Sequence, residues 1–160
     1  MRKPILAVSV TALFLAVSCK HAKTGVTPSS TPGSPKTVTI RVTPDPARPG
    51  FFKIAADPDS VNISKRGHEI IKWCVDFASP SDDTLVHIGG FVKEGDPSRK
   101  DPFGTLPTDN VFDIAHFDFR CRVKSKEAAP DAMGAYKYNI VFKVRGEDRG
   151  NLDPRVIIGD

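Results

Sequence analysis

The sequence predicts an all-β domain, an antiparallel β-sandwich or barrel, over residues 37–160. Along several short stretches, apolar and polar residues alternate, which is the period of strands with one buried face. The 14 prolines and 12 glycines suit the many turns that short strands require. No stretch of useful length has a helical period. A domain of about 124 residues is large enough to bury an adequate core.

The first predicted strands lie in the N-terminal half of this domain. Residues 37–43 alternate cleanly, and a turn rich in proline ends them. Two brief strands are predicted over 51–56 and 59–64. Residues 69–77 follow, and their alternation places four apolar side chains on one face, namely Ile71, Trp73, Val75 and Phe77.

The remaining strands lie in the C-terminal half. Residues 84–92 are largely apolar, with an interruption at Gly89-Gly90. Residues 117–124 alternate, and residues 134–146 have the most regular pattern in the chain. A last strand is predicted over 155–159. Eight strands separated by turns favour a sandwich or barrel over other all-β architectures.

The N-terminus has the three parts of a bacterial secretion signal. Arg2 and Lys3 precede an apolar segment of 13 residues, which is too short to span a bilayer comfortably. The segment ends in Leu15-Ala16-Val17-Ser18-Cys19, which resembles the lipobox of bacterial lipoproteins. The resemblance implies a signal peptide over residues 1–18 and a lipid on Cys19. Plain secretion is the alternative, because Ala16-x-Ser18 also fits the ordinary signal peptidase.

Residues 19–36 are expected to be a flexible tether, since Ser, Thr, Pro, Gly and Lys dominate them. The resemblance places the protein in the cell envelope, and Lys20 after the cysteine favours the outer membrane over retention in the inner membrane. The membrane is then one partner of the chain, reached through its N-terminal lipid.

The charge distribution argues against nucleic-acid binding. Five basic residues and no acidic residue lie in residues 1–36, so the rest of the chain has 18 basic residues against all 19 acidic ones. The folded domain is therefore nearly neutral, whereas a nucleic-acid binder concentrates basic charge on its folded surface.

Four stretches together resemble the cupredoxins. They are DPDSVNI followed by GHEIIKW, then LVHI, then GAYKY, and finally DPRVII. The resemblance covers most of residues 37–160 and implies a Greek-key, plastocyanin-like fold. In that family one loop, just after the Tyr-x-Tyr strand begins, supplies a Cys, a His and a Met to type 1 copper. Residues 139–160 contain none of the three, so we expect no copper and no other cofactor.

A copper-binding protein for electron transfer or copper handling, with a non-standard site, remains the alternative. Its candidate ligands are His87, His116, Cys121 and Met133. The simpler interpretation is that His87 forms a local hydrogen bond within a strand. His68 and His116 would then lie at strand ends near the surface.

Cys74 and Cys121 remain once Cys19 is lipidated. An even pair in an oxidising compartment favours a disulfide. Two buried free thiols are the alternative, because the strand pattern points Cys74 away from the face of Trp73 while Cys121 shares the apolar face of its own strand. Redox use is disfavoured, since there is no Cys-x-x-Cys.

We expect no enzymatic activity, because there is neither a Gly-x-Ser-x-Gly nor a glycine-rich phosphate loop. The expected role is binding or accessory assembly with a protein partner that the sequence does not identify. The candidate surface is the long loop from Gly95 to Asn110, with Phe103, Arg99 and Lys100. Alternatively, Phe103 folds back as a lid on the sandwich.

Overall fold

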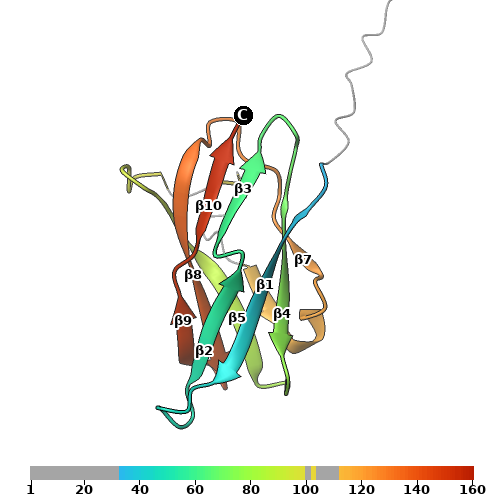
Figure 1. The fold of residues 1–160 in the computed structure, drawn as a ribbon, viewed down its shortest axis with the longest axis vertical. Coiled ribbons are helices and arrows are strands. Elements are labelled where there is room, and N and C mark those ends of the chain that lie inside the picture. The colour runs from blue at the N-terminus through green and yellow to red at the C-terminus, as the bar shows by residue number, and fades with distance from the viewer. Residues whose placement is uncertain (1–32, 100–101, 104–111) are drawn as a thin grey trace, which may run out of the picture.

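A computed structural model describes residues 33–99, 102–103 and 112–160 of the chain. Cys19, Lys100 and the rest of the expected signal peptide and tether lie outside these residues. Nearly all regular structure in these residues is strand, and they contain one short 3₁₀ helix, η1 (Figure 1). The elements, in chain order, are β1 (Lys36–Pro44), β2 (Phe52–Asp57), β3 (Ser60–Ser64), β4 (Ile71–Phe77), β5 (Thr84–Lys93), β6 (Phe112–Ala115), η1 (His116–Asp118), β7 (Val123–Lys124), β8 (Gly134–Val144), β9 (Glu147–Leu152) and β10 (Arg155–Gly159). Among the described residues, no helix is long and apolar enough to cross a bilayer.

The strands form two sheets. One sheet has the order β2-β1-β4-β7, and the other has the order β3-β10-β8-β5-β6 with β9 also paired to β8. The predicted all-β class is confirmed, but the prediction of purely antiparallel sheets was wrong. β1 pairs with β4 in parallel, and β10 pairs with β3 in parallel. A parallel pair needs a long connection between its strands. Between β1 and β4, the chain segment that contains β2 and β3 provides this connection.

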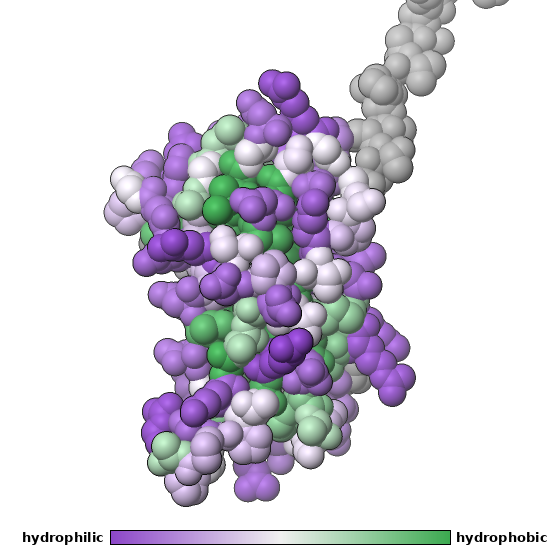
Figure 2. All heavy atoms as spheres, viewed as in Figure 1, coloured by the Kyte–Doolittle hydropathy of each residue, from purple (hydrophilic) through white to green (hydrophobic). Residues whose placement is uncertain are grey.

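The core lies between the two sheets and follows the predicted alternation. Every second residue of β8 is buried, from Tyr136 through Tyr138 and Ile140 to Phe142, with exposures between 0 and 1%. Trp73 of β4 is also completely buried. On the face viewed in Figure 2, apolar side chains form two groups along the strands, with hydrophilic side chains between and around them. Burial of these large side chains is the main favourable term in folding.

The two sheets approach each other closely where β9 passes β2. Gly150 of β9 lies so near the Phe52 carbonyl that a Cβ atom at position 150 would be 2.5 Å from this oxygen. Half-buried Ile54 of β2 and Leu152 of β9 pack against the core. β9 was not predicted as a strand, because its sequence EDRGNL has no apolar alternation.

The strand predicted over residues 117–124 was also wrong. The chain forms η1 and then turns, and only Val123 and Lys124 pair, with β4. Phe119 is nevertheless buried, and its carbonyl accepts a hydrogen bond from the Val75 N–H. Cys121 has φ 65°, in the left-handed region that interrupts an extended strand. The apolar alternation therefore comes from a loop folded over the edge of β4.

Candidate functional site

Loops meet at two ends of the sandwich, which we name by the segments they contain. The tether end contains residues 33–36, 64–70, 93–99, 102–103 and 125–134. The hairpin end contains residues 45–52, 78–84 and 144–149. β8 runs from the tether end at Gly134 to the hairpin end at Val144 (Figure 1). Its 11 residues span about 36 Å at about 3.3 Å per residue.

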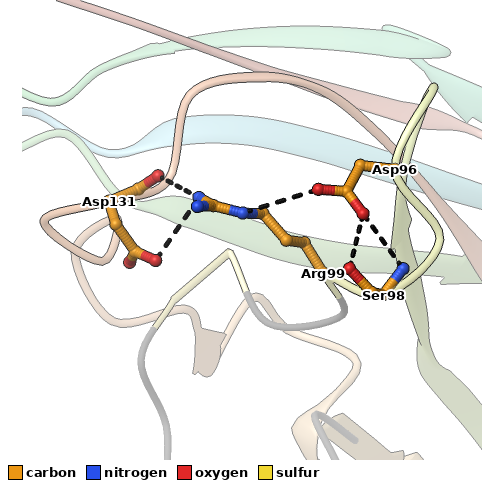
Figure 3. Close-up of polar contacts among 4 residues, drawn as sticks. All are labelled: Asp96, Ser98, Arg99 and Asp131. Atoms are coloured by element: carbon orange, nitrogen blue, oxygen red, sulfur yellow. Dashed lines mark hydrogen bonds and ion pairs between the residues drawn. The ribbon is translucent and has the colours of Figure 1, made fainter.

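Arg99 joins two segments of the tether end. Its guanidinium lies between Asp131 and Asp96 (Figure 3). Nη1 donates to the Asp131 carbonyl at 3.0 Å, and Nε lies 3.6 Å from Asp96 Oδ2. Asp96 Oδ1 accepts a bond of 2.5 Å from the Ser98 hydroxyl, and this bond lowers the pKa of Asp96. The predicted binding residue Arg99 thus has a positioning role within the domain.

Phe103, the aromatic residue of the predicted binding loop, is only 2% exposed. Its ring packs edge to face against Phe91, with centroids 5.5 Å apart, and lies 6.3 Å from the Phe112 ring. Phe103 therefore folds back onto the sandwich, which confirms the alternative prediction for this residue. Its apolar surface serves the core rather than solvent.

The irregular segment 125–134 lies over the tether end. Ser125 holds it to β4, because its hydroxyl accepts the Ile71 N–H at 2.8 Å. Lys65 Nζ donates to the Pro130 carbonyl at 3.1 Å. His68 Nδ1 lies 2.7 Å from Glu127 Oε2. A shallow apolar depression forms here, lined by Ile70, Phe103, Lys126, Glu127, Ala128, Ala129 and Pro130.

The hairpin end holds an open hollow of about 530 Å³, lined by Gly50, Phe52, Ser81, Asp83, Val144, Arg145, Glu147 and Arg149. Arg145 is tied to Asp83 by two contacts. Its backbone N–H donates to the Asp83 carbonyl at 2.8 Å, and its Nε lies 3.2 Å from Asp83 Oδ2. Arg149 pairs with Glu147. Acidic and basic side chains both line the hollow. A partner surface that carries charges of both signs would therefore complement it.

An aromatic ring and a buried carboxylate support the 45–52 turn of the hairpin end. The guanidinium carbons of Arg48 and Arg149 lie 5.1 and 5.6 Å from the centre of the Phe51 ring. The Asp45 side chain is 6% exposed. It accepts hydrogen bonds of 3.0 Å from Arg48 Nε and from the Ala47 N–H. These two hydrogen bonds hold the pKa of Asp45 below its usual value, and the bond from Arg48 has the larger effect.

The three histidines of the domain each have a carboxylate neighbour. His87 Nδ1 lies 2.8 Å from Asp113 Oδ1, and His116 Nε2 lies 3.1 Å from Asp82 Oδ1. His87 and Asp113 are direct cross-strand partners in β5 and β6. The predicted local hydrogen bond of His87 is therefore present. No group of three or more His, Cys, Asp or Glu side chains that could hold a metal ion occurs within the described residues.

Cys74 and Cys121 form the predicted disulfide, with an S–S distance of 2.00 Å and a Cα–Cα distance of 4.1 Å. The conflict of side-chain directions noted in the sequence disappears, because Cys121 lies in a turn rather than in a strand. Of the other candidate copper ligands, Met133 is 36% exposed at the tether end. The structure thus places Cys121 in a covalent bond and His87 and His116 beside different carboxylates.

Within the part of the chain that the structure describes, two polar atoms deep in the core have no hydrogen-bond partner of good geometry, Trp73 Nε1 and Tyr138 Oη. Burial raises the pKa of Tyr138 to about 12, while the neighbouring indole of Trp73 lowers it slightly. The Phe91 ring stacks on the Tyr138 ring at 5.0 Å. We interpret this cluster as part of the core, since Trp73, Tyr138 and Phe91 are each at most 1% exposed and belong to the buried apolar cluster of the domain.

Sequence reasoning missed the hairpin end as a site. The only local signal is the charged run RGEDRG at residues 145–150. Its partner residues Ser81 and Asp83 lie far away in the sequence, so their proximity requires the pairing of β5 with β8. No protein family model matches this chain, and no curated protein is found to be similar to it.

Proposed function

We propose that this protein is a lipid-anchored, non-catalytic binding module of the bacterial envelope, with a Greek-key, cupredoxin-like domain. The observation that carries the proposal is the hairpin end. There the tight turn between β8 and β9, with Arg145 paired to Asp83, lines an open hollow of about 530 Å³. Such a surface can recognise a protein partner by shape and by exchange of ion pairs.

The order of the strands supports the proposed fold. The connections β2 to β3, β3 to β4, β4 to β5, β6 to β7 and β7 to β8 each cross from one sheet to the other. Repeated crossing between two packed sheets is typical of Greek-key sandwiches. The C-terminal strand β10 lies between β3 and β8, in the interior of its sheet. The segments quoted for the resemblance cover most of β3 and β10, part of β5, and the first residues of β4 and β8.

The absence of Cys, His and Met from residues 139–160 supports a copper-free module. At the position expected for the copper loop, the chain makes the tight turn between β8 and β9 with Arg145 and Gly146. Copper binding at a non-standard site is the competing function. It would have to use His87 or His116 without the Cys121 thiolate, which is bonded to Cys74.

Two experiments test the proposal. Added Cu(II) is expected to produce no intense thiolate-to-copper absorption and no stoichiometric binding, and either result would establish the competing function. Cys19→Ser is expected to move the mature protein from the membrane fraction to the soluble fraction and to abolish incorporation of labelled fatty acid. Retention of both properties in the variant would refute the lipid anchor.

Partner binding is tested by charge reversal at the hairpin end. Crosslinking in envelope extract is expected to capture a defined partner with the wild type and to lose it with Arg145→Glu. Arg155→Glu is the matched control, because Arg155 is also half or more exposed and ion-paired but lies on β10, away from the hollow. Equal loss with both variants, or with neither, would contradict the hairpin end as the recognition surface.

A further inference from the structure

The described chain begins against the tether end. The Gly33 N–H donates to the His68 carbonyl at 2.8 Å, and the Lys36 N–H donates to the Ile70 carbonyl at 2.8 Å. Gly33 is so close to the 64–70 turn that a Cβ atom on it would lie 2.0 Å from the Gly67 carbonyl oxygen. The point at which the N-terminal segment joins the domain is therefore fixed on this end.

The distance from Cys19 to this point limits how the domain can lie. The 13 intervening residues, 20–32, have a composition that predicts a flexible chain, with an average reach of about 20 Å. The hairpin end lies about 36 Å further along β8, at about 3.3 Å per residue. To bring the hairpin end to the lipid, the tether would need to stretch most of the way to its contour length of about 48 Å. The tether end is therefore the one held near the lipid surface.

The chemistry of the tether end fits a headgroup surface. Met133 is 36% exposed, and Pro130 is exposed beside the shallow apolar depression. Two exposed cations lie at the same end: Lys126, which also lines the depression, and Arg66 in the 64–70 turn, whose side chain is 80% exposed. Apolar side chains flanked by cations are typical of surfaces that lie at the headgroup boundary.

Carboxylates at the same end weaken its attraction to anionic lipid. Asp131 is 77% exposed beside Arg99, and Asp160 is 55% exposed beside Arg66. The contact is therefore weak for the free domain and depends on the high local concentration that the tether provides. The short tether keeps the domain near the lipid surface, so that even a small apolar contact can hold its orientation.

We propose that the tether end rests on the lipid headgroup surface, with Met133, Pro130 and Lys126 in the contact, and that the hairpin end points away from the membrane. This inference rests on the proposed function, since it requires an N-terminal anchor. It adds the orientation of the domain and the lipid surface as the occupant of the apolar depression.

The test uses the mature chain from residue 19, with Cys19→Ser and an N-terminal histidine tag. The tag binds vesicles of phosphatidylethanolamine and phosphatidylglycerol that contain a nickel-chelating lipid. A fluorophore is attached to Lys126→Cys at the tether end or to Arg145→Cys at the hairpin end, under conditions that keep the native disulfide. A quencher on the lipid headgroup is expected to act several-fold more strongly on the label at 126. Equal quenching, or stronger quenching at 145, would overturn the proposal.

Two further variants test the contact itself. Met133→Asp is expected to reduce the quenching at 126, whereas Ile157→Asp is not, and Ile157 is a matched control because it is 38% exposed on β10. An unchanged signal with Met133→Asp would overturn the apolar contact and leave the depression available to a protein.

Lengthening the tether with a Gly/Ser repeat is expected to reduce the contrast in quenching between the labels at positions 126 and 145. Since nickel lipid replaces the acyl chains, failure of this test is distinct from failure of lipidation at Cys19.

Discussion

Removal of the Cys74–Cys121 disulfide should strongly destabilise the domain. The bond links residues 47 positions apart. In the chain-entropy model, a closed loop of this length restricts the unfolded chain by about 4 kcal/mol at room temperature. We therefore expect Cys74→Ala/Cys121→Ala to lower the free energy of unfolding by about 3–4 kcal/mol. With an unfolding entropy of about 0.26 kcal/mol/K for a domain of this size, this loss lowers Tm by about 12–15 °C.

Urea denaturation gives both the free energy and the mechanism. A constraint on the unfolded state predicts a higher m-value for the variant, because an unfolded chain without the crosslink exposes more surface. Dithiothreitol should lower the stability of the wild type to that of the double variant and leave the variant unchanged. A loss below about 1 kcal/mol, which is less than this class of bond ordinarily contributes, would refute the reasoning. An unchanged m-value would refute its entropic part.

Three smaller perturbations test other features of the structure. Gly150→Ala should cost about 1–3 kcal/mol of unfolding free energy, because the added Cβ would lie 2.5 Å from the Phe52 carbonyl, whereas Gly159→Ala has open space and should be tolerated. The wild type should lose stability above pH 10, because burial raises the pKa of Tyr138 to about 12. Tyr138→Phe should abolish about 1.4 kcal/mol of this loss at pH 11, measured by urea denaturation. Asp45 has a lowered pKa, so its stabilising effect is present above pH 3.8 and disappears as the pH falls through the native pKa. Asp45→Asn should therefore show a smaller drop in Tm between pH 5 and pH 2.

The local pattern of the sequence predicts strands well where one strand face meets the core. In β8 the period of two determines the burial of Tyr136, Tyr138, Ile140 and Phe142 directly. The same pattern fails at residues 117–124, because Phe119 is buried from a turn and Cys121 is bonded to β4. An alternating sequence shows only which side chains are apolar. A loop that packs over the edge of a sheet can bury such side chains as well as a strand can.

The pairing of distant segments is what the sequence cannot specify locally. The parallel pairing of β1 with β4 leaves no periodic signal, since side-chain alternation is the same in parallel and antiparallel strands. The contact between His87 and Asp113 depends on the register of β5 with β6, and a shift by one residue would move His87 to the other face. The charged pairs of the hairpin end depend in the same way on the register of β5 with β8.

The ion pairs at the hairpin end make it suited to a reversible contact. The Arg145 side chain is 81% exposed, and its pair with Asp83 lies at the surface. Exposed pairs of this kind contribute about 0–1 kcal/mol to stability. A partner that offers its own carboxylate to Arg145 can therefore replace Asp83 at little cost to the fold. At the other end, Arg99 is tied to the backbone of Asp131 as well as to carboxylates, and replacing its partners would loosen the segment 125–134. Of the two ends, the hairpin end is thus the one that can change partners without losing structure, and in the orientation that we propose it is also the end that faces away from the membrane.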